Sequence, residues 1–282
     1  MQLPADKIQV LHKCAMIGFS LMTLSIIPAS VRASSLVQNG SFEDVATYGP
    51  SAGPFAGDLG DSPSCNSLSA CVAVPDWTTA ASLSIFFTTG VSGNTPILLD
   101  GGGSISAADG NNFVGSDGAF GILGPISQTL TGLTVGQSYV LSFDQAAGQL
   151  SGNCCATQEQ WMVTIGGTIP GSPTSITLPD SSSIGAYVVS GYDNQWVTPI
   201  ISNVSGGFSG WQPESYTFTA SATTELLAFL GLGAPQGAPP FVLLDNVAVN
   251  AASSPEPESL ALALLGAVLL AAALTRRRRK AV

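Results

Sequence analysis

The stretch GYDNQWVTP gathers two aromatic and three polar side chains that together could bind a sugar. They are Tyr192, Asp193, Asn194, Gln195 and Trp196. Saccharide binding uses a flat aromatic ring against the C–H face of a sugar, with amides and carboxylates around its hydroxyls. The surrounding sequence predicts a loop. The alternative interpretation is that the Tyr and the Trp simply pack this loop onto the body of the domain.

Other chemistry is restricted by the absence of basic side chains. No Lys, Arg or His occurs between Arg32 and Arg276, whereas fifteen Asp and Glu lie from Glu43 to Asp245, a formal charge of −15. There is therefore no His for a nucleophile or a metal, no lysine for a Schiff base and no guanidinium for an oxyanion. The negative charge also excludes nucleic acid as a partner. Two carboxylates can hydrolyse a glycosidic bond, but no motif marks a pair.

The N-terminus has the three parts of a secretory signal peptide. Lys7 and Lys13 precede the apolar run CAMIGFSLMTLSII, and the small residues Val31 and Ala33 follow it. The run is too short for a bilayer span, which favours cleavage over anchoring. We expect residues 1–33 to be removed and the rest to be exported.

The C-terminus carries a second apolar segment. Residues 260–274 are uninterrupted apolar residues, which as a helix would cover about 22 Å of a ~30 Å hydrocarbon core. The basic cluster Arg276–Lys280 follows and would stay on the cytoplasmic side by the positive-inside rule. We expect a short single transmembrane helix. The alternative, a core helix with a basic tail, would require polar residues at helical spacing.

This tail resembles the PEP-CTERM sorting signal of exported bacterial proteins, because Pro255, Glu256, Pro257 and Ser259 match its opening motif and the apolar run and basic cluster follow in order. The resemblance implies that residues 255–282 are a sorting segment recognised by an exosortase, a membrane protease-transpeptidase. It also implies a Gram-negative host and a link to exopolysaccharide and the envelope. The alternative is a plain anchor that is never cleaved.

Residues 34–254 have the pattern of one all-β domain. In QSYVLSFDQ, Tyr139, Leu141 and Phe143 alternate with more polar residues, which predicts a strand with one buried face. WMVTIGG and SYTFTA repeat this alternation, while LLAFLGLG and FVLLDNVAV are nearly continuous apolar runs typical of central strands. We expect long loops at GPSAGPFAGDLGDSPSCNSLSA and at 171–185.

The order LVQNGSFED, DGNNFVGSDG, ISQTLTGLTVGQSYVLSFDQAAG, GWQPESYTFTA, LLDNVAV resembles the galactose-binding-like jelly rolls that include many carbohydrate-binding modules. The resemblance implies a jelly-roll β-sandwich with LVQNGSFED as its first strand. It also implies a structural calcium that ties the first strand to the last, with Glu43 and Asp245 at the matching positions. The alternative is that these two carboxylates belong to a turn and a strand end. We expect Trp77, Trp161 and Trp211 to be core residues.

Four cysteines follow the signal peptide: Cys65, Cys71, Cys154 and Cys155. In an exported chain an even number indicates disulfides, with three possible connectivities. We favour a Cys65–Cys71 bridge because the loop that contains both residues is rich in Ser, Pro and Gly. The alternatives for the adjacent Cys154 and Cys155 are a strained vicinal bridge between them, or separate bridges from each to Cys65 and Cys71.

These observations lead to one main hypothesis: a non-catalytic protein of the cell surface or the extracellular matrix that binds or organises polysaccharide, with transient anchoring in the inner membrane. Two alternatives remain, a carboxylate-based glycoside hydrolase or lyase and a structural envelope protein without a specific ligand.

Overall fold

The computed structural model describes residues 35–48, 56–59, 71–80, 83–89, 99–100, 105–252 and 265–270. The predicted signal peptide, the Pro-Glu-Pro motif and the basic cluster lie outside these residues. Within the C-terminal apolar run, residues 265–270 are helical. Across the described ranges, no helix is both long and apolar enough to cross a membrane. The transmembrane segment therefore stays a prediction.

The described residues from 35 to 252 form β-strands in three sheets. The nine-stranded sheet has the order β1-β3-β2-β5-β7-β18-β10-β16, with β6 paired to β10. In that order its strands are β1 (Ala46–Tyr48), β3 (Cys71–Ala73), β2 (Ala56–Leu59), β5 (Ser84–Thr88), β7 (Asn112–Asp117), β18 (Pro240–Ala251), β10 (Ser138–Leu150) and β16 (Gln212–Thr219), and β6 is Leu99–Asp100.

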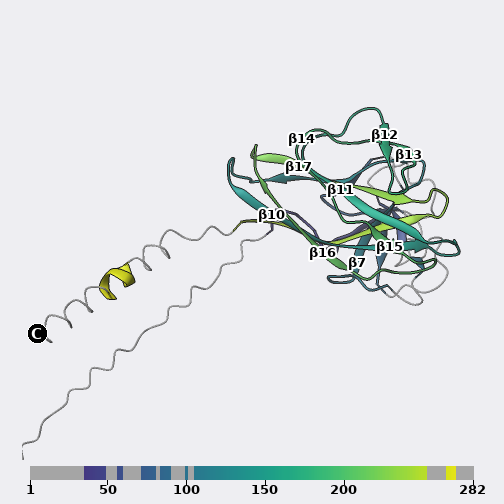
Figure 1. Cartoon of the computed structure of the whole chain (residues 1–282), viewed down its shortest axis with the longest axis horizontal. Coiled ribbons are helices and arrows are strands. Elements are labelled where there is room, and N and C mark those ends of the chain that lie inside the picture. Colours follow the sequence, from purple (N-terminus) through teal and green to yellow (C-terminus); the bar gives the residue numbers. More distant parts are fainter. Residues whose placement is uncertain are drawn as a thin grey trace, which may run out of the picture. The chain divides into compact units, whose positions relative to one another are not determined.

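The six-stranded sheet has the order β14-β11-β17-β9-β4, with β15 also paired to β11. Its strands are β14 (Ser190–Val197), β11 (Thr157–Thr168), β17 (Thr224–Ala234), β9 (Ile126–Thr131), β4 (Thr78–Thr79) and β15 (Ile201–Asn203). A three-stranded sheet consists of β12 (Thr174–Thr177), β13 (Ser183–Ala186) and β8 (Ile122–Leu123). Figure 1 shows β10, β16 and β7 in one layer and β11, β14 and β17 in the other. The expected all-β sandwich is confirmed.

The main core lies between the two large sheets. Alternation along β10 turns Tyr139, Leu141 and Phe143 inward, as predicted, and all three are buried. From the facing sheet, Trp161 is fully buried and donates from Nε1 to the Leu243 carbonyl 3.1 Å away, so its single polar group is satisfied. Phe229 packs edge-on against Phe143, with ring centroids 5.1 Å apart.

The outer face of each large sheet carries a further apolar cluster, which explains the continuous apolar runs. On β17, Leu230 and Leu232 point away from the main core and pack with Leu123, Leu178 and Ala186 of the three-stranded sheet and its connections. On the nine-stranded sheet, a separate cluster includes Phe87, Phe113, Phe241 and Leu243, with Trp211 packed against it. Trp77 and Trp161 are core residues as expected, whereas Trp211 is half-buried on this outer face.

Two local expectations are wrong. Residues 35–45 form bends and turns instead of a first strand, because Asn39 and Phe42 adopt positive φ values of 48° and 57° that interrupt an extended chain. Isolated hydrogen bonds, such as Leu36 N to Val249 O at 2.9 Å, still hold this segment beside β18. Both expected loops contain strands: β2 lies within the loop at 49–70, and β12 and most of β13 lie within 171–185.

Candidate functional site

The predicted sugar-binding stretch is an edge strand, which corrects the expectation of a loop. Residues 190–197 form β14, which pairs with β11 so that Trp196 lies opposite Val163 and Gln195 opposite Thr164. The register shifts next to Gly166, where Asp193 is left out of the pairing. Such a bulge breaks strict alternation of the side chains along the strand.

Trp196 is turned toward the inside of the sandwich. It is partly buried against the main core, and its ring stacks on Tyr216 of β16 with centroids 5.2 Å apart and an interplanar angle of 30°. Because β14 and β16 are edge strands of the two large sheets, this pair closes the seam between the layers. For Trp196, the structure therefore favours the alternative interpretation of packing.

The other members of the stretch are more accessible. Tyr192 is 40% exposed and donates its hydroxyl to Gln195 Oε1 at 2.8 Å. Gln195 Nε2 contacts Met162 Sδ at 3.0 Å. Asp193 is exposed and accepts a hydrogen bond from the Ser221 hydroxyl at 2.7 Å, whereas Asn194 is half-buried. The ring of Tyr192 and the polar side chains of Asp193 and Gln195 thus remain accessible to a ligand.

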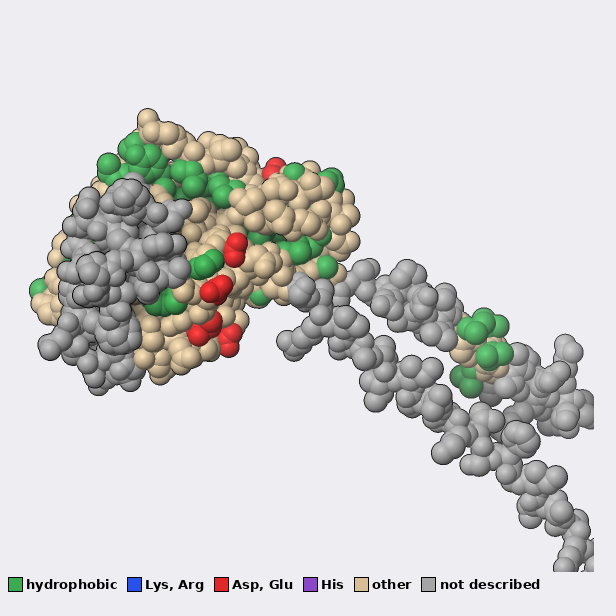
Figure 2. Space-filling model, turned by 180° about the vertical axis from the view of Figure 1, so that it is seen from behind, with side chains coloured by type: hydrophobic (Ala, Val, Ile, Leu, Met, Phe, Trp, Pro, Cys, Tyr) green, Lys and Arg blue, Asp and Glu red, His purple; other side chains and the backbone are tan. Residues whose placement is uncertain are grey.

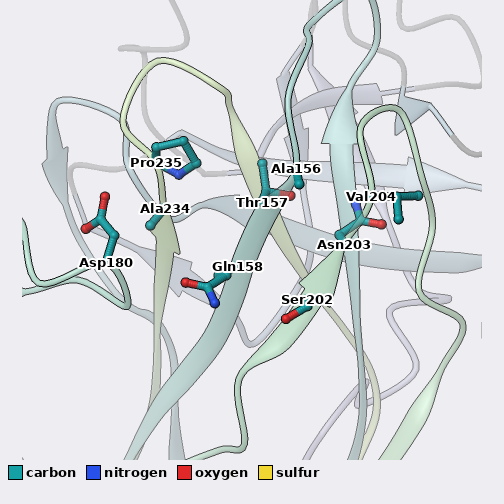
Figure 3. Close-up of a pocket in the computed structure, with 9 residues that line it drawn as sticks. All are labelled: Ala156, Thr157, Gln158, Asp180, Ser202, Asn203, Val204, Ala234 and Pro235. Atoms are coloured by element: carbon teal, nitrogen blue, oxygen red, sulfur yellow. The ribbon is translucent and has the colours of Figure 1, made fainter.

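A pocket of about 390 Å³ lies at the other end of β11 (Figure 3). It is lined by Ala156, Thr157 and Gln158 from the start of β11, Ser202, Asn203 and Val204 from the end of β15, Ala234 and Pro235 from the end of β17, and Asp180 from the connection between β12 and β13. The sequence analysis missed this pocket. Its walls come from four segments that no local motif links, so only the strand pairing brings them together.

The pocket combines hydrogen-bonding groups with small apolar surfaces. Gln158 and Ser202 are directly paired neighbours across β11 and β15, and both side chains are accessible. Asp180 Oδ1 accepts hydrogen bonds from the Ser182 hydroxyl and amide, and the first of these in particular lowers the pKa of Asp180. Asp180 is therefore an ionised acceptor. Pro235 and Val204 add exposed apolar walls.

Glu43 and Asp245, the expected calcium ligands, both hold the segment that precedes β7. Glu43 Oε1 accepts backbone hydrogen bonds from Asn111 and Asn112, each at 2.7 Å. Asp245 Oδ2 accepts from the amides of Ala108 and Asp109 at 2.8 and 2.9 Å. Burial raises the pKa of Asp245 to about 7.

These contacts test how well the two carboxylates suit a calcium ion. Their hard oxygens are the ligands that Ca²⁺ prefers, but Glu43 Oε1 and Asp245 Oδ2 already accept N–H donors. The described residues include no group of three or more acidic, His or Cys side chains able to hold a metal. A fit therefore depends on the second oxygen of Glu43 and on backbone carbonyls.

Two other carboxyl groups have perturbed chemistry. Glu159 and Asp117 are almost completely buried, and burial raises the pKa of Glu159 to about 8 and that of Asp117 to about 6. Acid–base residues of an enzyme often show such shifts, but they must reach a substrate. Neither side chain lines the described pocket, so neither is placed to act on a ligand bound there.

The cysteines are only partly described. Cys154 and Cys155 are exposed free thiols in the turn between β10 and β11. Cys71 begins β3, and Cys65 lies outside the described residues. The Cys65–Cys71 bridge therefore stays a prediction.

Comparison with solved structures finds β-sandwich domains at low similarity. The CBM22-1 xylan-binding domain from Paenibacillus barcinonensis is 12% identical over 64% of this chain and 87% of its own, with a TM-score of 0.33. TmCBM61, solved with beta-1,4-galactotriose, is 11% identical over 78% and 100%, with a TM-score of 0.34. The K3 cleaved adhesin domain of Lys-gingipain from Porphyromonas gingivalis is 14% identical over 63% and 91%, with a TM-score of 0.35.

No protein-family model matches the chain, and no curated protein is similar to it. The class that the strands define is an all-β sandwich, and carbohydrate-binding modules are among its structural neighbours. At these identities and TM-scores, any ligand has to be argued from the residues of this chain.

Proposed function

We propose that this chain is an exported, non-catalytic β-sandwich protein that binds polysaccharide. The observation that carries the proposal is the pocket at the start of β11, where an amide, a hydroxyl and an ionised carboxylate lie beside apolar walls. Sugars present hydroxyls that donate to and accept from such groups, and C–H surfaces that pack against apolar ones.

The charge of the domain points to a neutral glycan. Figure 2 shows acidic side chains on one face and no basic or histidine side chain among the described residues in view. The sequence has none from residue 33 to residue 275. An anionic polymer would bring its charges close to Asp180 without any cation to offset them, which opposes binding.

The exposed part of β14 supplies a second contact in this proposal. Gln158 in the pocket and Gly166, which pairs with Tyr192, are eight residues apart on β11. At about 3.3 Å per residue this corresponds to roughly 26 Å. An extended polysaccharide can reach both places, whereas a mono- or disaccharide cannot.

Binding is tested with the full chain and a matched pair of variants on one strand. Gln158→Ala removes an amide from the pocket, whereas Gln160→Ala removes the same group one pleat further along β11, outside the pocket. Isothermal titration with soluble neutral polysaccharides should show binding that Gln158→Ala weakens about three- to tenfold and Gln160→Ala leaves unchanged. Equal effects of the two variants, or no binding to any neutral glycan, would reject this site.

Sorting and localisation belong to the same proposal. We infer that the tail that begins at Pro255 directs the protein, through an exosortase, to the surface or matrix of a Gram-negative bacterium. Support comes from the motif, the apolar run and the basic cluster in the sequence. Intact mass of protein from the native host tests this: a chain that ends near residues 255–257 agrees with sorting, and one that retains Arg276 to Val282 contradicts it.

Calcium is a further part of the proposal, held by the second carboxylate oxygen of Glu43, by backbone carbonyls and by Asp245 Oδ1, which accepts a single backbone amide, that of Asn246. The ion would tie the segment before β7 to β18 and raise thermal stability. Adding EDTA should lower the melting temperature of the wild type, whereas Glu43→Gln should melt at the same temperature with and without chelator. A wild-type melting curve that EDTA and added Ca²⁺ leave unchanged would exclude the ion.

A further inference from the structure

The turn between β10 and β11 carries two adjacent thiols whose side chains meet. Cys154 and Cys155 are both exposed, and the thiol of Cys154 lies within hydrogen-bonding reach of the thiol of Cys155. Neighbouring side chains in an extended chain point to opposite faces. Here Cys155 has a φ of 87°, a conformation that residues other than glycine seldom adopt. The chain is therefore not extended at this residue, and the two side chains are not forced to opposite faces.

The backbone of the pair is held by hydrogen bonds to the buried Gln149 and to Ser205. Gln149, fully buried, donates from Nε2 to the carbonyls of Cys154 and Cys155 at 2.9 and 3.0 Å. Its Oε1 accepts from Gly206 N at 2.6 Å, and Cys155 N donates to the Ser205 hydroxyl at 2.9 Å. A positive φ at a non-glycine residue persists when surrounding contacts fix it, and these contacts do so at Cys155.

We propose that Cys154 and Cys155 form a vicinal disulfide by exchange with a low-molecular-weight disulfide. For the protein in its native host, the presence of this disulfide rests on the export proposed above, because disulfides persist in oxidising compartments. The chemistry itself depends only on the two thiols and the oxidant.

The exchange balances in two steps. One cysteine thiolate attacks the small disulfide, forms a mixed disulfide and releases one small thiolate, which takes up a proton. The neighbouring thiolate then attacks the protein sulfur and releases the second small thiol. The protein loses two protons and two electrons in total, and the small disulfide is reduced to two thiols.

The resulting bridge should open easily. Adjacent Cα atoms are about 3.8 Å apart, shorter than the usual range of about 4.4 to 6.8 Å for bridged cysteines, so the ring is strained and more readily reduced. The next residue, Ala156, lines the pocket, and Ser205 follows the pocket residue Val204. The bridge would thus stiffen the mouth of the pocket in a way that a mild reductant reverses.

The test uses the full chain, first reduced and then incubated with oxidised glutathione. Remaining thiols are alkylated under denaturing conditions with a maleimide near neutral pH, where enough thiolate is present to react. The protein is then acidified and digested with pepsin, which requires no Lys or Arg. The expected result is a peptide that contains Cys154 and Cys155 without alkylation and is lighter than the reduced peptide by two hydrogen atoms. Cys71→Ser should give the same peptide, whereas Cys155→Ser should lose it.

Two outcomes would overturn the proposal: alkylation of both cysteines after oxidation, or peptides that link either of them to Cys65 or Cys71. The same mapping on protein from the native host tests export separately. A bridge that forms in glutathione but is absent in the host would contradict export and leave the vicinal chemistry in place.

Discussion

Replacing Glu159 by Gln should remove a large part of an alkaline loss of stability. Glu159 is fully buried, and neither of its carboxyl oxygens has a hydrogen-bond partner among the described residues. Its neighbours in the sheet are Ile201 and Gly233, and the nearby charged group is Asp117. Burial raises its pKa from 4.5 to about 8, and the Asp117 charge adds to this.

The sign follows from proton binding. Between these two pKa values the folded state keeps the proton on Glu159 and the unfolded state has lost it, so stability falls as the pH rises. The contribution is fully present below the unfolded pKa and is lost as the pH passes through the folded pKa. At about 1.36 kcal/mol per pH unit, the wild type should lose about 4 kcal/mol between about pH 5 and about pH 8 from this residue alone. That is a large part of a typical unfolding free energy of about 5–15 kcal/mol.

The assay is urea unfolding followed by tryptophan fluorescence at several pH values. Glu159→Gln keeps the shape but cannot ionise, so its unfolding free energy should exceed that of the wild type progressively toward alkaline pH. The control is Glu214→Gln, at a carboxylate whose two oxygens accept hydrogen bonds from Gln145 and Tyr216; it should retain the alkaline loss because Glu159 is intact. Parallel pH profiles for the wild type and Glu159→Gln would refute the reasoning.

Three further predictions test the core, the packing of the backbone and the composition. Trp161→Ala should lower the unfolding free energy by about 3–5 kcal/mol in denaturant melts, because it empties a fully buried site and leaves the Leu243 carbonyl without its donor. Gly124→Ala should abolish the native circular dichroism spectrum, since an added Cβ would overlap the backbone carbonyl of Ala80. Trypsin should leave residues 33–275 uncut even in urea, and mass spectrometry should detect this whole segment, because it contains no Lys or Arg.

The sequence predicts the strands best where a single buried face dictates period-two alternation. Leu141 and Val163 are examples, each on a strand with more polar residues between the buried ones. Prediction fails where tertiary contacts override local signals. Asp180 lies between two short strands in a stretch whose Gly, Ser and Pro content is typical of a loop. The pairing of β13 with the distant β8 has no local signature in the sequence.

The candidate site, too, could be predicted only in part from the sequence. The types of residue in Tyr192–Trp196 are compatible with a sugar, but the side to which each ring points depends on the strand register and on the position of β16, where Tyr216 covers Trp196. The pocket around Gln158 could not be predicted, because Ser202 reaches it only through the pairing of β15 with β11.

The missing cations explain how the carboxyl groups of this domain are arranged. With no Lys, Arg or His to pair with, a carboxylate that leaves water must accept N–H or O–H donors or remain protonated. Glu225 takes the first course, accepting the backbone amides of Ser221 and Ala222, and Glu159 takes the second. Asp245 combines them, since it accepts the backbone amides of Ala108 and Asp109 and also has a pKa raised by burial. Carboxyl groups of the second kind make the fold sensitive to alkali, whereas an exposed acceptor such as Asp180 stays ionised and free to meet a sugar hydroxyl.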